Sequence, residues 1–150
     1  KKNINNFGFT IIELLVVIAI IGVLAAIVLV NVTRYIDRGK DAAAKGDLAT
    51  LLTNAVTFYN ENGDFDGIAS DPDYANVLSS LASDKMSYAV TVKCATAEGD
   101  ETACGTASGS AKWCASIQEK ADDSLNYCVD ANGAKKESAT AVCSAGICPN

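Results

Sequence analysis

The chain has 150 residues and a formal net charge of −6, with 20% charged and 49% hydrophobic residues. This length suits one domain with a long appendage, and the acidic balance disfavours nucleic-acid binding through phosphate neutralisation. The sequence has no histidine, no Gly-rich phosphate loop and no Ser nucleophile elbow, so we predict neither an enzyme nor a bound cofactor.

The first thirty residues hold the strongest feature of the sequence. Lys1 and Lys2 precede an apolar run, and residues 14–30 contain no charged or strongly polar side chain. A basic start before an apolar run is typical of a secretory signal peptide, but this run exceeds the roughly 7–15 residues of such a signal and no small-x-small site follows it. The break between polar and apolar residues falls at Gly8, so cleavage there would keep the apolar segment in the processed protein.

The residues around this break resemble the prepilin processing motif of type IV pilins and type II secretion pseudopilins: Gly8-Phe9-Thr10-Ile11-Ile12-Glu13. The resemblance implies that residues 1–8 are a leader peptide, that a prepilin peptidase cleaves after Gly8, and that Phe9 is then N-methylated. It also implies that Glu13 is the fifth residue of the processed chain, where this family has a glutamate.

Glu13 also stands out on physical grounds. A carboxylate in an apolar membrane helix raises the free energy of membrane insertion by about 2.5–3.5 kcal/mol, and by less near the interface. Such a residue therefore indicates a functional role. After cleavage, its expected partner is the new α-amino group of Phe9 on a neighbouring subunit, which would favour assembly in register. The alternative is that Glu13 only sits in the headgroup region, favoured there by the helix dipole.

Gly22 lies within the apolar run. As a small residue it allows close helix packing, and as a glycine it weakens the helix by roughly 1 kcal/mol relative to alanine. In the resembling family, a glycine at this offset lies where the helix unwinds locally during assembly. The proline often found eight residues further on is replaced here by Val30.

We predict one helix over residues 9–60. Its first part, 9–32, has 24 residues of which three are polar, enough to span a bilayer core of about 30 Å and to form a filament core. Its second part, 33–60, is amphipathic, with apolar residues at helical spacing on one face: Leu48, Leu51, Leu52, Ala55, Val56 and Tyr59. Basic residues flank both sides of the span, so the cysteines decide its orientation, with the C-terminal part outside the cytoplasm.

Residues 61–150 form the predicted head. Gly63 is a plausible helix C-cap, and Asp71-Pro72 predicts the N-cap and first residue of a short helix. The predicted fold class is α+β and type IV pilin-like, with the long N-terminal helix packed on a small antiparallel sheet head with disulfides.

Three segments of the head alternate in the manner of strands, 87–93, 112–117 and 124–129. The Gly-, Ser-, Thr- and Ala-rich segment 95–111 is expected to be an exposed loop. Asn132-Gly133 is a strong signal for a tight turn, consistent with a further hairpin.

All six cysteines lie in the head, from Cys94 to Cys148, with no CxxC spacing and no histidine nearby. Disulfides are therefore favoured over a metal site. Six cysteines allow 15 connectivities, and the sequence does not choose among them. We predict local pairs, the last of which closes a C-terminal region that resembling pilins often bound with a disulfide: Cys94–Cys104, Cys114–Cys128 and Cys143–Cys148.

A calcium site is the one metal hypothesis to weigh. Asp122, Asp123, Asp130 and Asn132 could coordinate calcium, as a loop in some pseudopilins does, but their spacing fits no EF-hand. Solvated loop carboxylates are the favoured interpretation, and we predict no metal.

These features favour a structural subunit: a pilin of a type IV pilus-like surface filament. The alternatives are a pseudopilin of a type II secretion or competence system, and a membrane-anchored adhesin or receptor head. The expected partners are copies of the same chain in a helical homopolymer, the prepilin peptidase and the pilus assembly machinery, with no nucleic acid. The expected location is the cytoplasmic membrane, with a single pass and the C-terminus outside, and then the extracellular filament.

Overall fold

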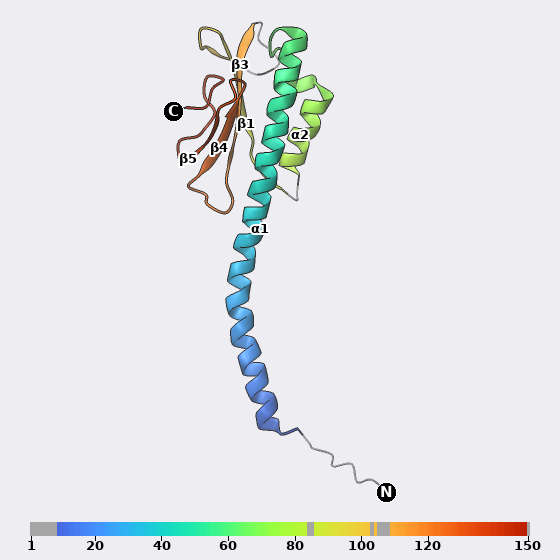
Figure 1. Cartoon of the computed structure of the whole chain (residues 1–150), viewed down its shortest axis with the longest axis vertical. Coiled ribbons are helices and arrows are strands. Elements are labelled where there is room, and N and C mark those ends of the chain that lie inside the picture. The colour runs from blue at the N-terminus through green and yellow to red at the C-terminus, as the bar shows by residue number, and fades with distance from the viewer. Residues whose placement is uncertain (1–8, 84–85, 103, 105–108, 150) are drawn as a thin grey trace. The chain divides into compact units, whose positions relative to one another are not determined.

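The computed structural model describes residues 9–83, 86–102, 104 and 109–149 (Figure 1). The described elements are α1 Ile11–Asn62, the 3-10 helix η1 Ile68–Ser70, α2 Pro72–Ala82, β1 Thr91–Thr96, β2 Glu101–Thr102, β3 Ser110–Gln118, β4 Asn126–Asp130 and β5 Lys135–Ser138. Contacts between residues divide the chain into two compact units, the first ending at Ile36 and the second beginning at Asp37.

The first unit contains the N-terminal part of α1. The side chains described here, from Phe9 to Ile36, are exposed. The helix contains a stretch that is long and apolar enough to cross a membrane by length and composition, and none of this stretch is buried. Apolar residues cover the helix on all sides rather than along one stripe, which is the pattern of a helix surrounded by lipid or by other protein.

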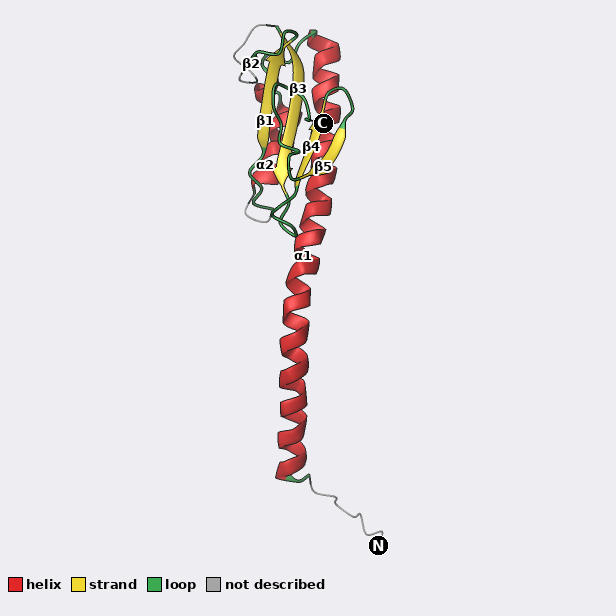
Figure 2. Cartoon of the chain, turned by 90° about the vertical axis from the view of Figure 1, so that its left-hand side faces the viewer, coloured by secondary structure: helices red, strands yellow, loops and turns green. Residues whose placement is uncertain are grey.

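The second unit is built around an antiparallel sheet with the strand order β2-β1-β3-β4-β5 (Figure 2). Because successive side chains of a strand point to opposite faces, alternate residues of β3 enter the core shared with α1 and α2: Trp113, Ala115 and Ile117. They belong to the same core as the buried face of α1, formed by Ala44, Leu48, Leu51 and Ala55. The fold is therefore α+β, with the helix packed on one face of the sheet as predicted (Figure 1).

The amphipathic pattern of α1 is confirmed for Leu48, Leu51 and Ala55, all fully buried. It is wrong for its last members, because Val56 is 37% and Tyr59 36% exposed. These two side chains line a hollow at the end of the head rather than the core.

The expected helix caps are present. α1 ends before Gly63, whose φ of 86° is in the left-handed region that glycine adopts readily. Asp71 caps α2, because its Oδ1 accepts a hydrogen bond of 2.9 Å from the Tyr74 amide, and Pro72 is the first helical residue. The hydroxyl of Tyr74 then accepts a 2.9 Å hydrogen bond from Trp113 Nε1, which ties α2 to β3 through the core.

The strands differ from the prediction at their ends. The strand expected over 87–93 begins only at Thr91, after a Ser87 with a positive φ of 54°. The expected loop 95–111 contains the end of β1, all of β2 and the start of β3. The hairpin after Asn132-Gly133 is present as β4 and β5, and Gly133 has a positive φ of 86°.

The structure pairs the cysteines as Cys94–Cys104, Cys114–Cys143 and Cys128–Cys148. The first pair was predicted, whereas the predictions of Cys114–Cys128 and Cys143–Cys148 are wrong. The register of β3 against β4 explains the first error, since Cys114 faces Asp130 and Cys128 faces Ser116.

The two strand cysteines are thus diagonal neighbours, which are about 7–8 Å apart, beyond the usual Cα separation of about 4.4–6.8 Å for a disulfide. Both side chains project from the sheet face opposite the helices. The C-terminal segment lies on this face, so each strand cysteine pairs with one of its cysteines, at Cα separations of 5.7 and 5.8 Å.

Candidate functional site

The N-terminus of α1 is closed by a capping box. Thr10 donates from its amide and its hydroxyl to Glu13 Oε2, at 2.9 and 2.8 Å, and the Glu13 amide donates back to Thr10 Oγ1 at 3.2 Å. The spacing Thr-x-x-Glu is a readable sequence signature of this motif, which our sequence analysis did not use. Among the described residues, no hydrogen bond involves the second carboxylate oxygen of Glu13, Oε1.

The predicted processing site lies next to this cap. Phe9 is 75% exposed and precedes the first residue of α1 by two positions. Gly8, the other predicted processing residue, lies outside the described residues. A peptidase that cuts before Phe9 would therefore release the chain directly at the start of the helix, one residue before the capping threonine.

The apolar side chains described in the first unit are exposed rather than buried. Large apolar side chains are exposed on every turn from Phe9 to Ile36, whereas soluble monomers rarely expose contiguous apolar patches above a few hundred Å². The polar Asn31 within this stretch satisfies its side-chain amide on its own helix, through a 3.4 Å hydrogen bond to the carbonyl of Ile27. From Phe9 to Val32 the helix is thus suited to an apolar environment, apart from the carboxylate of Glu13.

Gly22 lies in the uninterrupted part of α1. Apart from the backbone of its own helix, a Cβ placed on it would meet no heavy atom of the described residues within 4 Å, so none of these residues requires a glycine there. Gly22 lies nine positions after Glu13, which places the two on opposite sides of an ideal helix. The structure therefore brings Phe9, Thr10 and Glu13 together and leaves Gly22 apart from them.

Asp41 anchors α1 to the head. It is 3% exposed, and its carboxylate accepts hydrogen bonds from the Tyr88 hydroxyl and from the amides of Lys120 and Ala121, both at 2.8 Å. Burial alone would raise the pKa of Asp41, but these hydrogen bonds hold it below its ordinary value. Burial, together with the bond to Asp41, raises the pKa of Tyr88.

Sequence reasoning missed Asp41, and the available signal was its position. It lies three and seven residues before Ala44 and Leu48, on the buried stripe of α1. An acidic residue on such a stripe must be hydrogen-bonded to be tolerated.

Lys45, one turn after Asp41, forms the second polar anchor. Its ammonium pairs with Glu119 at 2.8 Å and with Glu137 at 2.6 Å, and lies 5.3 Å from the ring centre of Tyr127. Burial would lower the pKa of Lys45, but the two carboxylates raise it above its ordinary value. Residues of α1 are thereby joined to the end of β3, to β4 and to β5.

The acidic residues weighed for calcium do not converge. Asp130, at the end of β4, is buried and accepts hydrogen bonds from the amides of Asn132, Ala134 and Cys148. Asp122 lies before the opposite end of β4 and binds Ser124, whose hydrogen bonds lower the pKa of Asp122. Among the described residues there is no group of three histidine, cysteine or acidic residues that could hold a metal ion.

Comparisons with known proteins agree with the geometry at the N-terminus. A family profile described as "Prokaryotic N-terminal methylation motif" matches residues 4–29. The type IV major pilin protein PilA of Myxococcus xanthus (strain DK1622) is 40% identical over 75 residues, which is 50% of this chain and 34% of that protein. The chain thus matches about a third of the length of this curated relative, and no solved structure matches it. The methylation motif, the similarity to a major pilin and the long helix packed on a disulfide-bonded sheet together make the chain similar to type IV pilins.

Proposed function

We propose that this chain is the structural subunit of a type IV pilus-like surface filament, in which the apolar part of α1 becomes the packed core. The observation that carries the proposal is the exposure of large apolar side chains on all sides of the helix from Phe9 to Ile36. Such a surface is stable in lipid or against other copies of itself. A filament that bundles these helices removes the surface from water completely.

Processing follows the family motif in this proposal. A prepilin peptidase removes residues 1–8 by cutting after Gly8, and Phe9 becomes the N-methylated first residue. Oε1 of Glu13, which has no hydrogen bond among the described residues, then accepts a hydrogen bond from the α-amino group of Phe9 of a neighbouring subunit, while Oε2 keeps its bonds to Thr10. The pairing cancels two poorly solvated charges only when a second subunit is present, and so it favours assembly in a defined register.

The open side of Gly22 supports the same proposal. Because no described residue packs against this position, we infer that its small size serves a contact outside the subunit. Small residues allow neighbouring apolar helices to approach closely.

The helix and the disulfides support the location in this proposal. The subunit waits in the cytoplasmic membrane as a single-pass protein, with its three-disulfide head in an oxidising compartment outside the cytoplasm. Assembly machinery then moves it into the filament.

The test is electron microscopy of material sheared from the cell surface, combined with mass spectrometry of the subunit in it. We expect long fibres whose subunit begins with N-methylated Phe9. Fibres containing an intact Lys1 terminus would contradict the processing. Absence of surface fibres, with the processed subunit confined to the cell envelope, would favour the pseudopilin or anchored-head alternatives over a pilus.

A further inference from the structure

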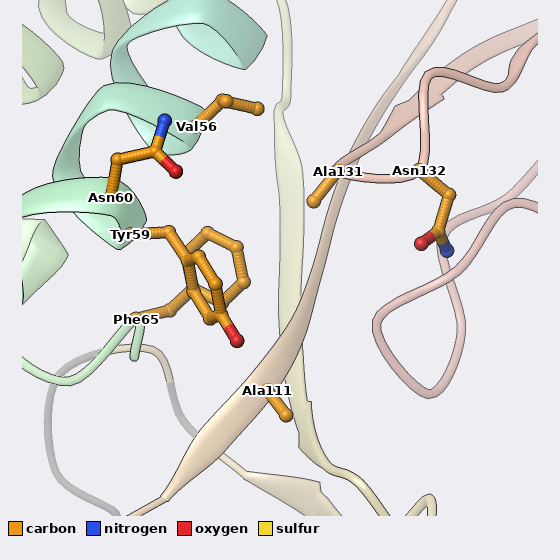
Figure 3. A pocket seen from close by; sticks show the side chains of 7 residues that line it. All are labelled: Val56, Tyr59, Asn60, Phe65, Ala111, Ala131 and Asn132. Atoms are coloured by element: carbon orange, nitrogen blue, oxygen red, sulfur yellow. The ribbon is translucent and has the colours of Figure 1, made fainter. Parts of the chain in front are cut away.

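The exposed apolar surface of α1 continues beyond the predicted span. Tyr35 and Ile36, after the end of that span, are 71% and 52% exposed. The head differs, because Val56 and Tyr59 there line a hollow of about 310 Å³ that contains no charged side chain (Figure 3). We name residues 33–40 of α1 the neck, in which apolar and charged side chains mix. Its charged members are Arg34, Asp37, Arg38 and Lys40.

The neck carries the opposite charge to the head. It has three basic residues and one acidic residue, a formal charge of +2, whereas residues 41–150 have seven basic and sixteen acidic residues, a charge of −9. Arg34 and Arg38 are exposed and Lys40 is half-buried. Among the described residues, none of these three side chains forms an ion pair or a hydrogen bond. The neck is therefore a small cationic island on an acidic protein.

The nearby carboxylates leave this island unpaired. Asp37 is half-buried and lies four positions before Asp41, on the helix face that packs on the head, and no ion pair joins it to either arginine. Asp122 and Asp123 are exposed and follow Ala121, whose amide binds Asp41. These two carboxylates repel an anionic surface, so any contact with one falls to the neck rather than to this part of the head.

Helix geometry gives the depth of the neck when residues 9–32 span the bilayer. A helix rises 1.5 Å per residue, so the Cα atoms of Arg34 and Arg38 lie about 3 and 9 Å beyond Val32. The headgroup region extends about 5–7 Å beyond the hydrocarbon core on each side. Because Cα–Cβ bonds of a helix tilt toward its N-terminus, the side chain of Arg38 leans back toward the membrane. Both guanidinium groups therefore reach the depth of the lipid phosphates.

The chemistry of the neck fits a phospholipid headgroup. Arg34 and Arg38 are four positions apart, which places their side chains on one face of the helix. A guanidinium group donates two parallel hydrogen bonds to a phosphate, and the alkyl stem of an arginine covers apolar surface while its charged end stays polar. Tyr35, between them in sequence, is of a residue type enriched at membrane–water interfaces.

We propose that the neck binds anionic phospholipid headgroups before assembly, with Arg34 and Arg38 on the lipid phosphate and Tyr35 at the same depth. This inference rests on the proposed function and adds the class of lipid that holds the subunit in the membrane. The occupant is a lipid because the neck is continuous with the apolar span and lies at the depth of the phosphates. Its positive charge selects an anionic lipid over a zwitterionic one.

The test measures which lipids the full-length chain retains. The chain is reconstituted in vesicles with about equal amounts of phosphatidylcholine and phosphatidylglycerol and extracted in a mild non-ionic detergent, and native mass spectrometry counts the bound lipids. We expect the wild type to retain about ten times more phosphatidylglycerol than phosphatidylcholine. Arg34→Gln and Arg38→Gln should each lower this ratio about fivefold, and the double variant should retain the two lipids about equally.

Two further variants separate the neck from charge in general. Lys135→Gln removes one positive charge from an exposed residue of β5 in the head, and this matched control should keep the wild-type ratio. Arg38→Lys keeps the charge but loses the paired donors, so its ratio should lie between those of the wild type and Arg38→Gln. Lys1 and Lys2 are present in every variant, so the differences report on the neck. Unchanged emission from the buried Trp113 shows that the head of each variant is folded.

Equal retention of the two lipids by the wild type would overturn the proposal. A ratio that stays high in the double variant would also overturn it, because the lipid would then bind elsewhere on the chain. If the double variant keeps the ratio but loses filaments, the arginines bind a neighbouring subunit instead of lipid. The measurement needs no filament, so an absence of surface fibres contradicts the proposed function and leaves the lipid result standing.

Salt provides a second measurement on the wild type alone. Ions screen the attraction between a cationic neck and an anionic lipid surface. The ratio of retained phosphatidylglycerol to phosphatidylcholine should therefore fall severalfold when vesicles are prepared at about 1 M rather than about 0.1 M sodium chloride. A ratio that does not change with salt would show that the lipid is selected by its apolar part and would refute phosphate binding by the neck.

Discussion

Asp41 offers the sharpest test of how α1 is held on the head. Replacing it with alanine leaves the Tyr88 hydroxyl and the amides of Lys120 and Ala121 without their acceptor. A hydrogen bond to a charged group contributes about 1.5–3 kcal/mol. Two of the three donors are only part-buried, and bonds that share one acceptor are not additive. We therefore expect Asp41→Ala to lower the free energy of unfolding by about 3–4 kcal/mol, and Asp41→Asn, which keeps one acceptor oxygen, by about 2 kcal/mol.

The assay is urea unfolding of the full-length subunit in detergent, followed by tryptophan fluorescence. Trp113 is the single tryptophan and is fully buried in the core of the head, so its emission reports on this unit. The matched control is Asp37→Ala, one turn earlier on the same helix, where the side chain is only partly buried. We expect the control to stay within about 0.5 kcal/mol of the wild type.

The pH dependence supplies a second readout. The pKa of Asp41 is lowered in the folded state, so its stabilising contribution is present above the unfolded pKa of about 3.9 and is lost as pH falls through the folded value. The stability difference between the wild type and Asp41→Asn should be constant from about pH 7 to pH 5 and shrink below about pH 4. If Asp41→Ala is as stable as the control, Asp41 does not hold α1 on the head. The same conclusion follows if the stability difference between the wild type and Asp41→Asn does not change with pH.

Three further predictions follow from single sites. Glu13→Ala should leave the subunit in the membrane fraction but lower its filament yield, and normal filaments from this variant would remove Glu13 from assembly. Gly146→Ala should be strongly destabilising in urea unfolding, because its φ is 69° and the new Cβ would lie 2.6–2.9 Å from atoms of β3. Gly133→Ala, which also has positive φ but open space, should cost only about 1 kcal/mol, and equal effects would contradict this steric account. Tyr74→Phe should cost about 1–3 kcal/mol because it leaves the buried Trp113 Nε1 without an acceptor, and an unchanged urea midpoint would show that this bond is dispensable.

The N-terminal site could be predicted from sequence because its chemistry is local. The capping residues Thr10 and Glu13 are three positions apart, and Gly8, the proposed cleavage residue, adjoins Phe9, so no distant part of the chain is needed to bring them together. Helical periodicity and the caps at Gly63 and Asp71 depend on equally short spacings. For the same reason the long helix, the short second helix and the hairpin at Asn132-Gly133 were predictable.

Tertiary structure alone decided the features that join distant segments. The disulfides depend on the register that places Cys114 opposite Asp130, and on a C-terminal segment that crosses the outer face of the sheet. The role of Asp41 depends on amides nearly eighty residues away. The exposure of Tyr59 depends on where α1 passes beyond the sheet core. Helical spacing determines which residues share a face, but packing against non-local strands determines which part of that face is buried, and residues distant in the chain meet only once the sheet has formed.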